Sequence, residues 1–333
     1  MRIKCVVSAV LSVLLLLSCS GNDPLPLHKS SRLLMGTLVD VAVIGEEERA
    51  KAATESIFNE IKRIENLTSF YNPSELTKIN DNSGKGPTKA SGELLGIIGE
   101  ALRIARLTGG AFDPTVGALS RLWQFSGPGE PHLPPESEIK EALTKVGWNR
   151  VRIDTEAETI LLPDAGMALD LGGIAKGYTL NRIAEILSKW GITSALVNIG
   201  GDILAAGEKQ PGKPWLVGVE DPRNPRGIVA VAPLKDRIIV TSGDYERFFT
   251  KDEKRYHHII DPRSGYPSDK LRSVTIVGPI GGTLQPAGTA TFVLGVEEGL
   301  KFIRTVEGTQ ALLIDAEGNA HLSEGAGAVF ETK

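Results

Sequence analysis

Segments with helical spacing and segments with strand spacing follow one another in blocks along this chain, and this order restricts the fold more than any other feature of the sequence. Helical spacing dominates up to about residue 190, and short apolar runs bounded by turn residues dominate after it. A doubly wound parallel sheet would need a repeating strand–helix–strand order, which the sequence does not have. The pattern therefore predicts an α+β fold in which mixed β-sheets carry flanking helices.

The individual elements follow from apolar spacing, caps and stop signals. Ser91 is a typical helix N-cap, and the Gly109-Gly110 pair is a typical helix end. The expected helices cover residues 46–65, 91–108, 114–123, 136–145, 175–190, 286–294 and 297–306. The expected strands cover residues 33–43, 194–199, 215–219, 228–232, 237–241, 257–260 and 273–277. Two hairpins are also expected, one around Glu156 and one around Gly318.

Residues 1–18 have the composition of a secretory signal peptide, with a basic start and an apolar run too short to span a membrane comfortably. The run ends in Leu-Leu-Ser-Cys, a match to the bacterial lipobox, which predicts a lipid anchor at Cys19. An ordinary signal peptide with a chance cysteine is the alternative. We expect residues 19–30 to form a tether and residues 31–333 to form one large domain. The expected location is the periplasmic face of the inner or outer membrane, as an exported lipoprotein.

Cysteine usage and charge exclude several classes of protein. Both cysteines, Cys5 and Cys19, precede the body of the chain, so the body can have no disulfide, no Cys-ligated zinc and no cysteine nucleophile. A body of about 300 residues can bury enough apolar surface without disulfides. Removal of Arg2 and Lys4 with the signal peptide changes the formal net charge from −4 to −6. This acidity gives no support for nucleic-acid binding.

The stretch ALDLGGIAKGYTLNRIAEIL, residues 168–187, has the order strand end, Gly172-Gly173 turn, Lys176 and amphipathic helix. A helix N-terminus presents unpaired N–H groups and the positive end of the helix dipole, so this order is typical of a phosphate-binding loop. Neither the P-loop pattern nor the dinucleotide-binding pattern is present. Lys176 could face a phosphate or a carboxylate such as Asp170, or it could be a solvated lysine in the first helical turn.

Other polar and glycine-rich clusters also lie directly beside apolar runs. They are MGT (35–37), FDPTVG (112–117), NIGGD (198–202), TSGD (241–244) and HHIIDPRSG (257–265). Each alone is consistent with ordinary turn chemistry, and Asp170 and Asp244 could be ordinary caps. Together they predict loops that converge on one elongated ligand. Because neighbouring side chains on a strand point to opposite faces, only one of His257 and His258 can face such a site, which argues against a metal bound by the pair.

Eight motifs occur in order between about residues 33 and 303: MGT, SFYNPSEL, FDPTVGAL, DLGGIAKGY, LVNIGGDI, TSGDYERFF, HHIIDPRSG and GTATFVLG. In these motifs the chain resembles the ApbE family of FAD:protein FMN transferases, once described as thiamine-biosynthesis lipoproteins. The resemblance implies an ApbE-like, T-fold-related domain. It also implies an enzyme that splits the diphosphate of FAD with a divalent metal, usually Mg²⁺. Such an enzyme attaches FMN through a phosphoester to a threonine of a target protein and releases AMP.

The resemblance also implies roles for individual residues. His258 is the implied base, in a neighbourhood that includes Asp244, and Lys176 lies against the phosphates. A neutral histidine can take the proton of an attacking hydroxyl, and a lysine can neutralise charge on phosphate oxygens. The residues implied to contact FAD are Met35, Tyr71 (with Phe70 as the alternative aromatic), Ala111, Phe112, Asp113, Asp170, Lys176, His258 and Asp261.

The implied metal ligands are the Gly173 carbonyl, residue 285 and Thr289. The family usually has an aspartate four residues before this threonine, whereas this chain has Gln285. A glutamine carbonyl can ligate Mg²⁺ but brings no charge. We therefore expect weaker metal binding, or an ion held chiefly by the FAD phosphates and Asp170.

Three functions remain open from the sequence. The first is a transferase that flavinylates an exported redox protein, such as a flavin-bearing subunit of a membrane electron-transfer complex. The second is an FAD pyrophosphatase, in which water attacks in place of threonine. The third is an FAD-binding protein without turnover, for which Gln285 is the support. Lys176, His258, Asp244 and Thr289 favour an enzyme, because a protein that only binds FAD needs no base beside the phosphates.

Overall fold

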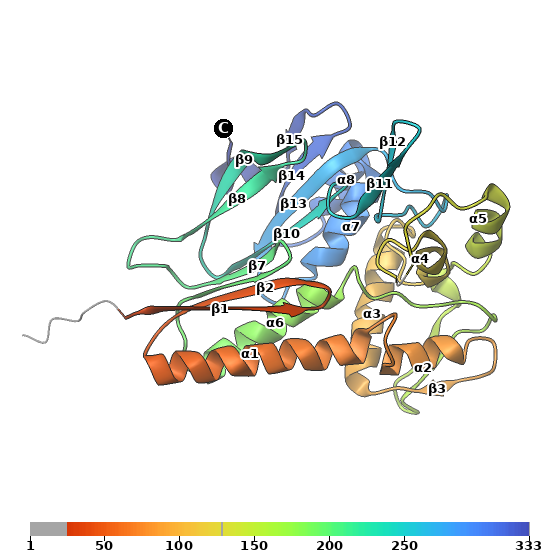
Figure 1. Cartoon of the computed structure of the whole chain (residues 1–333), viewed down its shortest axis with the longest axis horizontal. Helices are drawn as coiled ribbons and strands as arrows, with labels where there is room; N and C mark the ends of the chain where they lie inside the picture. Colours follow the sequence, from red (N-terminus) through yellow and green to blue (C-terminus); the bar gives the residue numbers. More distant parts are fainter. Residues whose placement is uncertain (1–24, 128, 333) are drawn as a thin grey trace, which may run out of the picture.

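The computed structural model describes residues 25–127 and 129–332, so the expected signal peptide and Cys19 lie outside the described residues. An eight-stranded sheet runs through the molecule, and every pair of neighbouring strands in it is antiparallel (Figure 1). In spatial order its strands are β1 (Leu27–Leu34), β2 (Thr37–Ile44), β6 (Ala195–Ile199), β7 (Asp202–Ala206), β10 (Arg237–Gly243), β13 (Leu271–Pro279), β14 (Gln310–Asp315) and β15 (Ala320–Leu322).

Four helices cover one face of this sheet: α1 (Glu47–Thr68), α6 (Ala175–Lys189), α7 (Leu284–Leu294) and α8 (Val296–Ile303) (Figure 1). Alternate strand residues point toward them, because successive side chains on a strand point to opposite faces. Val39, Val41 and Val43 of β2 are buried in the same apolar cluster as Ile57 and Ile61 of α1. Burial of such side chains, worth about 1.5–3 kcal/mol each, holds the helix layer on the sheet.

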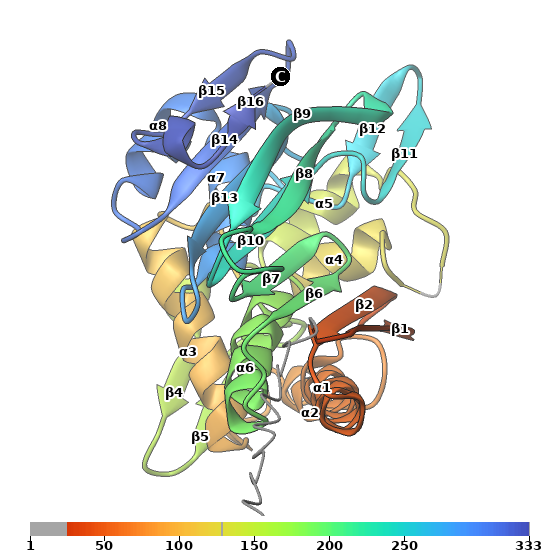
Figure 2. The same cartoon turned by 90° about the vertical axis from the view of Figure 1, so that its left-hand side faces the viewer.

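The other face of the sheet packs on a smaller sheet, formed by β16 (Glu331–Thr332), β9 (Asn224–Leu234) and β8 (Trp215–Asp221) (Figure 2). Trp215, Val217 and Val219 alternate along β8 and are buried against residues such as Ile239 of β10 and Val277 of β13. The central sheet is therefore apolar on both faces, which explains its nearly continuous apolar runs.

The remaining elements lie beyond one end of the sheet. The first group consists of α2 (Glu75–Asp81), β3 (Thr88–Lys89), α3 (Gly92–Leu107), the 3₁₀ turn η1 (Trp148–Arg150), β4 (Arg152–Asp154) and β5 (Thr159–Leu161). The second consists of α4 (Gly117–Trp123), α5 (Glu136–Leu143) and the hairpin of β11 (Phe248–Lys251) with β12 (Lys254–His257). Trp123 stacks on Phe125 and Tyr256 with ring centroids 5.7 and 5.8 Å apart, which fixes the hairpin against α4. A second 3₁₀ turn, η2 (Ala326–Ala328), precedes β16.

The helix predictions are confirmed with small shifts of boundary. Ser91 accepts a hydrogen bond from the Leu94 amide at the start of α3, as an N-cap does, and α6 ends before Gly191, whose φ is +64°. The expected helix at 114–123 begins three residues late, at Gly117. The two hairpins are also confirmed, as β4–β5 and β14–β15. No helix in the described ranges is long and apolar enough to cross a membrane.

Two strand predictions, and the expected tether, differ from the structure in their extent. The expected strand at 33–43 is a hairpin, because Met35 and Gly36 turn the chain with φ of +52° and +69°. β1 begins at Leu27, so the expected tether at 19–30 overlaps a strand. The strand expected at 257–260 is found earlier in the chain, as β12 (Lys254–His257). The short elements α2, β3, β7, β11 and β16 were not predicted.

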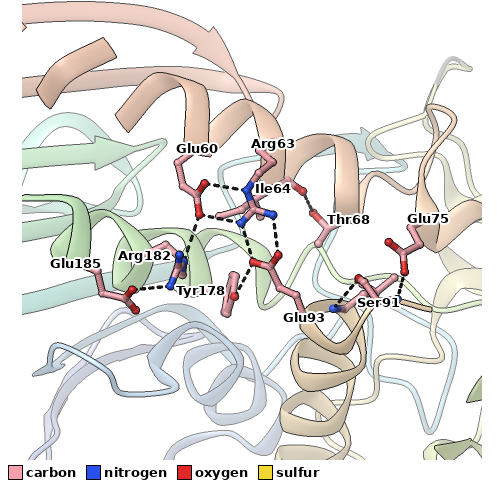
Figure 3. A network of polar contacts seen from close by, with 11 residues as sticks. Glu60, Arg63, Ile64, Thr68, Glu75, Ser91, Glu93, Tyr178, Arg182 and Glu185 are labelled. Carbon is pink, nitrogen blue, oxygen red and sulfur yellow. Dashed lines mark hydrogen bonds and ion pairs between the residues drawn. The ribbon is translucent and has the colours of Figure 1, made fainter. Parts of the chain in front are cut away.

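An ion-pair network fixes α6 to α1 and α3 (Figure 3). Arg63 of α1 bonds both Glu60 and Glu93, and the Tyr178 hydroxyl of α6 donates to Glu93 Oε1 over 2.8 Å. Arg182 of α6 bonds Glu60 and Glu185. Charge-assisted, bidentate bonds of this kind are stronger and more directional than single neutral ones. The first turns of α6, which carry Lys176, are therefore held in a defined position.

Candidate active site

Two turns pack against the N-terminus of α6, one between β6 and β7 and one between β1 and β2. Lys176 Nζ donates to the Gly200 carbonyl over 3.3 Å, which joins α6 to the turn between β6 and β7. A Cβ on Gly200, whose φ is +54°, would clash with the Thr37 side chain, so the β1–β2 turn also packs here. Met35 of that turn lies with its sulfur 3.7 Å from the Thr179 hydroxyl of α6. The predicted convergence of these loops is thus present.

Residues 170–173, which we call the glycine loop, lie directly before α6 and border the same site. The Asp170 carboxylate accepts a hydrogen bond from the Gly172 amide over 2.9 Å, and the Asp170 amide donates to the Pro114 carbonyl. A Cβ on Gly173 would lie 2.9 Å from the Phe112 ring, so this close packing requires glycine. The side chain of Gln285, from the start of α7, bonds the loop as well: its Nε2 donates to the Gly172 carbonyl over 3.0 Å.

Lys176 lies within electrostatic range of three titratable side chains, Asp202, Glu246 and His258. Burial raises the pKa of Asp202 to about 6, and the charge of Lys176 opposes that shift. Partial desolvation also raises the pKa of Glu246, again opposed by Lys176. Neither Asp202 nor Glu246 was expected in the site, although they lie in the NIGGD and TSGDYERFF motifs. The signal that could have found Asp202 is a charged residue at the first position of an otherwise apolar strand.

Of the two histidines, His258 is the one that the charge of Lys176 affects. Burial lowers the pKa of His258 to about 3, and the positive charges of Arg247, His257 and Lys176 lower it further. Its Nδ1 atom is buried and has no hydrogen-bond partner in the described part of the chain. The imidazole is therefore neutral near pH 7, and among residues 25–127 and 129–332 no group bonds its Nδ1 atom.

Asp244, expected beside His258, lies on the His257 side of the chain. Its carboxylate accepts bonds of 2.8 and 2.6 Å from Arg223 and one of 3.2 Å from Arg255. All three residues line a cavity of about 190 Å³ together with His257 and Ser268. Asp244 follows directly on the end of β10 at Gly243, and its place beside His258 in catalysis remains a prediction.

Two other expected FAD ligands make their hydrogen bonds to the protein. The Asp113 carboxylate accepts from the Thr115 amide, the Thr115 hydroxyl and the Trp148 amide, and burial raises the pKa of this carboxyl against those bonds. Asp261 accepts two bonds from the Arg263 side chain and one from its amide, which closes the turn after Ile260. Both are turn-forming groups here, and a direct contact of either carboxylate with FAD remains a prediction.

The expected aromatic residues border the site from another side. Tyr71 is 39% exposed and packs edge-on against Phe70, with ring centroids 4.9 Å apart. Burial raises the pKa of the Tyr71 hydroxyl to about 12, and the negative charge of Asp170 adds to the shift. Tyr71 is therefore near the glycine loop, as a residue that covers a bound ring would be. Ala111 is buried beneath the loop and contributes no polar side chain.

The expected Mg²⁺ site does not fit the residues present. None of Gly173, Gln285 and Thr289 is a carboxylate, whereas protein sites for Mg²⁺ usually supply one or two. The carboxylate that was expected to help, Asp170, accepts a hydrogen bond from the Gly172 amide. Gln285 Oε1 already accepts a bond from the Gly177 amide over 3.0 Å, and Thr289 lies one turn along α7. Within the described ranges, no three His, Cys, Asp or Glu side chains gather in a way that could hold a metal ion.

Comparisons with known proteins identify relatives over nearly the whole chain. The ApbE family model matches residues 35–313. The FAD:protein FMN transferase of Treponema pallidum is 35% identical over 326 residues, which cover 92% of this chain and 90% of that protein. The FAD:protein FMN transferase of Haemophilus influenzae is 31% identical over 312 residues, which cover 90% of each chain.

Solved structures agree with the sequence relatives. The ApbE protein of Thermotoga maritima superposes with a TM-score of 0.86 at 35% identity and covers 92% of this chain and 100% of its own. The flavin transferase ApbE of Vibrio cholerae superposes with a TM-score of 0.82 at 29% identity, with the same coverage. The predicted fold is therefore confirmed, and this chain belongs to the ApbE family.

Proposed function

We propose that this protein is an FAD:protein FMN transferase, the activity for which its relatives are named. The observation that carries the proposal is the arrangement of His258 and Lys176 at the N-terminus of the 15-residue helix α6. A neutral imidazole, a lysine and a helix N-terminus together offer a proton acceptor and a binding place for phosphate groups.

The proposed reaction needs one bond to form and one to break. The hydroxyl oxygen of an acceptor threonine attacks the phosphorus on the FMN side of FAD, the anhydride bond breaks, and AMP leaves with the electron pair. His258 accepts the hydroxyl proton, and the charges of Lys176 and Arg247 lie close enough to the imidazole to lower its pKa. Phosphoryl transfer of this kind depends mainly on positioning and on neutralisation of charge.

The partner of such an enzyme is a protein that carries the acceptor threonine. We propose an exported redox protein, such as a subunit of a membrane electron-transfer complex, because the N-terminal sequence predicts export. By the same reasoning, the enzyme is a lipoprotein anchored at Cys19 on the periplasmic side of a membrane. This part rests on the sequence alone, and retention of the Cys19→Ser variant in the soluble fraction of cells would support it.

A divalent metal can neutralise phosphate charge when it is bound. Because Gly173, Gln285 and Thr289 supply no carboxylate, Asp170 is the acidic side chain that would hold such an ion together with the FAD phosphates, and we assign no step to Mg²⁺.

The test is a reconstitution with purified residues 20–333, FAD and an acceptor domain that contains the threonine. The expected result is release of AMP together with a fluorescent acceptor band on a denaturing gel. Release of AMP with free FMN would replace the transferase by a pyrophosphatase. Bound FAD without AMP, with and without Mg²⁺, would contradict both reactions.

A further inference from the structure

Gln285 connects two segments that the candidate site needs in fixed positions. Its Oε1 accepts a hydrogen bond from the Gly177 amide over 3.0 Å, in the first turn of α6. Its Nε2 donates to the Gly172 carbonyl over 3.0 Å, in the glycine loop. The helix has no side-chain cap of its own, so Gln285 supplies from α7 the acceptor that an N-cap residue usually supplies.

The orientation of this carboxamide is determined by its neighbours. An N–H group lies on one side and a carbonyl oxygen on the other, so only one of the two flipped positions of the amide satisfies both. Gly177 allows the close approach, since a Cβ there would lie 3.0 Å from Gln285 Cβ. Gln285 thus acts as a clamp, by which we mean a side chain that bonds the glycine loop and α6 at the same time.

A carboxylate could not make both of these bonds. It accepts hydrogen bonds but donates none, so an aspartate or glutamate at this position would face the Gly172 carbonyl with no hydrogen between the two oxygens. Two such oxygens attract a cation between them, and Mg²⁺ prefers carboxylate and carbonyl oxygens. The neutral amide therefore holds the glycine loop against α6 by itself, whereas a carboxylate would need a bound cation to do so.

We propose that the Gln285 clamp allows this protein to bind FAD without a divalent metal ion. The proposal rests on the proposed function, because FAD is the ligand. The charges of Lys176 and Arg247, which both act on His258, and the N-terminus of α6 then supply the positive potential for the two phosphates. Gln285 is a positioning residue, and its role is visible in binding as well as in turnover.

The experiment compares the FAD affinity of the wild-type protein and the Gln285→Asp variant in EDTA and in Mg²⁺, by titration of flavin fluorescence. We expect the wild-type dissociation constant to change by less than about twofold between the two buffers. Loss of the clamp should weaken binding by the variant about tenfold in EDTA, the effect of roughly one good hydrogen bond, and Mg²⁺ should restore it. Wild-type binding that is lost in EDTA, or variant binding that is normal in EDTA, would overturn the proposal.

Asn181, on α6, offers a matched control. Its Oδ1 accepts from the Gly281 amide over 2.7 Å and its Nδ2 donates to the Gly282 carbonyl over 3.2 Å, so it makes the same pair of bonds to a different loop. Asn181→Asp should lower the melting temperature but leave FAD binding independent of Mg²⁺. Metal-dependent FAD binding in this control would show a general effect of the substitution and would overturn the proposal.

Melting of the ligand-free proteins separates this proposal from the proposed function. Mg²⁺ should raise the melting temperature of Gln285→Asp and leave that of the wild type unchanged. A folded protein that binds no FAD in any buffer would contradict the proposed function, and the melting temperatures would still decide the role of the clamp. If Mg²⁺ shifted the melting temperatures of the wild type and the variant equally, the proposed role of the Gln285 clamp would be wrong.

Discussion

His257 and His258 are adjacent in the chain, yet their surroundings give them different chemistry. His257 Nε2 lies 2.7 Å from the Ser268 carbonyl, and its Nδ1 accepts from the Ile259 amide over 3.3 Å. Both of its nitrogens therefore have protein partners, and its ring packs edge-on against Phe292. His258 has a buried Nδ1 without a partner and two cations, Arg247 and Lys176, acting on it. A satisfied histidine holds the fold together, whereas an unpartnered ring nitrogen such as His258 Nδ1, among the described residues, calls for a role other than packing.

The charged groups near His257 and those near His258 also differ in their partners. On the His257 side, the Asp244 carboxylate is matched by Arg223 and Arg255 at hydrogen-bond distance. On the His258 side, Lys176 donates to a neutral carbonyl, that of Gly200. The carboxyls that feel the charge of Lys176, Asp202 and Glu246, have their pKa values raised by burial, which favours their neutral forms. The groups near His257 are therefore expected to stabilise the fold, and the groups near His258 are expected to take part in the reaction.

The largest expected effect is on the chemical side. His258→Ala should lower the rate of FMN transfer by about 10²–10⁴-fold, the usual contribution of a general base. FAD affinity should stay within about twofold, because the base acts only in the chemical step. The measurement pairs AMP release with a fluorescence titration of FAD. A parallel loss of binding would mean that His258 packs against the flavin instead.

For Asp244→Ala, near His257, we expect the opposite result: a loss of stability with little change in activity. Removal of this carboxylate leaves Arg223 and Arg255 without their partner, which should lower the free energy of unfolding by about 2–3 kcal/mol. Turnover per folded molecule should change little, since the carboxylate lies on the His257 side. Urea denaturation gives the stability, and the AMP assay on the folded protein gives the activity. A stable but inactive variant would show that Asp244 takes part in the reaction, and the contrast between the surroundings of His257 and His258 would then be wrong.

A smaller effect concerns pH. Burial lowers the pKa of His258 to about 3, so between roughly pH 3 and 6.5 the unfolded chain binds a proton that the folded chain does not. The contribution of His258 to stability is therefore fully present above pH 6.5 and falls as the pH falls, by about 2 kcal/mol at pH 5. His258→Ala should flatten the pH dependence of the free energy of unfolding by that amount.

Asp202 acts in the opposite direction and makes this difference measurement necessary. Burial raises the pKa of its carboxyl to about 6, so its contribution to stability is present at low pH and is lost as the pH rises from about 4 through 6. Comparison of His258→Ala with the wild type, both followed by urea denaturation from pH 4 to 8, removes the Asp202 term. Identical pH profiles would show that His258 is not a buried neutral histidine.

Local signals predicted many of the secondary elements because each depends on a few neighbouring residues. Ser91 marked the start of α3, and Gly191 marked the end of α6, through backbone preferences that operate within one turn. The β1–β2 hairpin was missed because its turn is formed by Met35 and Gly36, and methionine with a positive φ is not a usual turn residue. β7 was missed because its five residues follow directly on a glycine turn.

The sequence by itself determined the family, the α+β class and the position of Lys176 in the first turn of a helix, since motif order, apolar spacing and capping are properties of the chain. Only the tertiary structure decided which charges meet. It placed Asp244 with two arginines, Asp202 near Lys176, and Gln285 between Gly172 and Gly177. These contacts join residues far apart in the sequence, and whether a polar group is satisfied depends on partners that only the folded chain brings within hydrogen-bond distance.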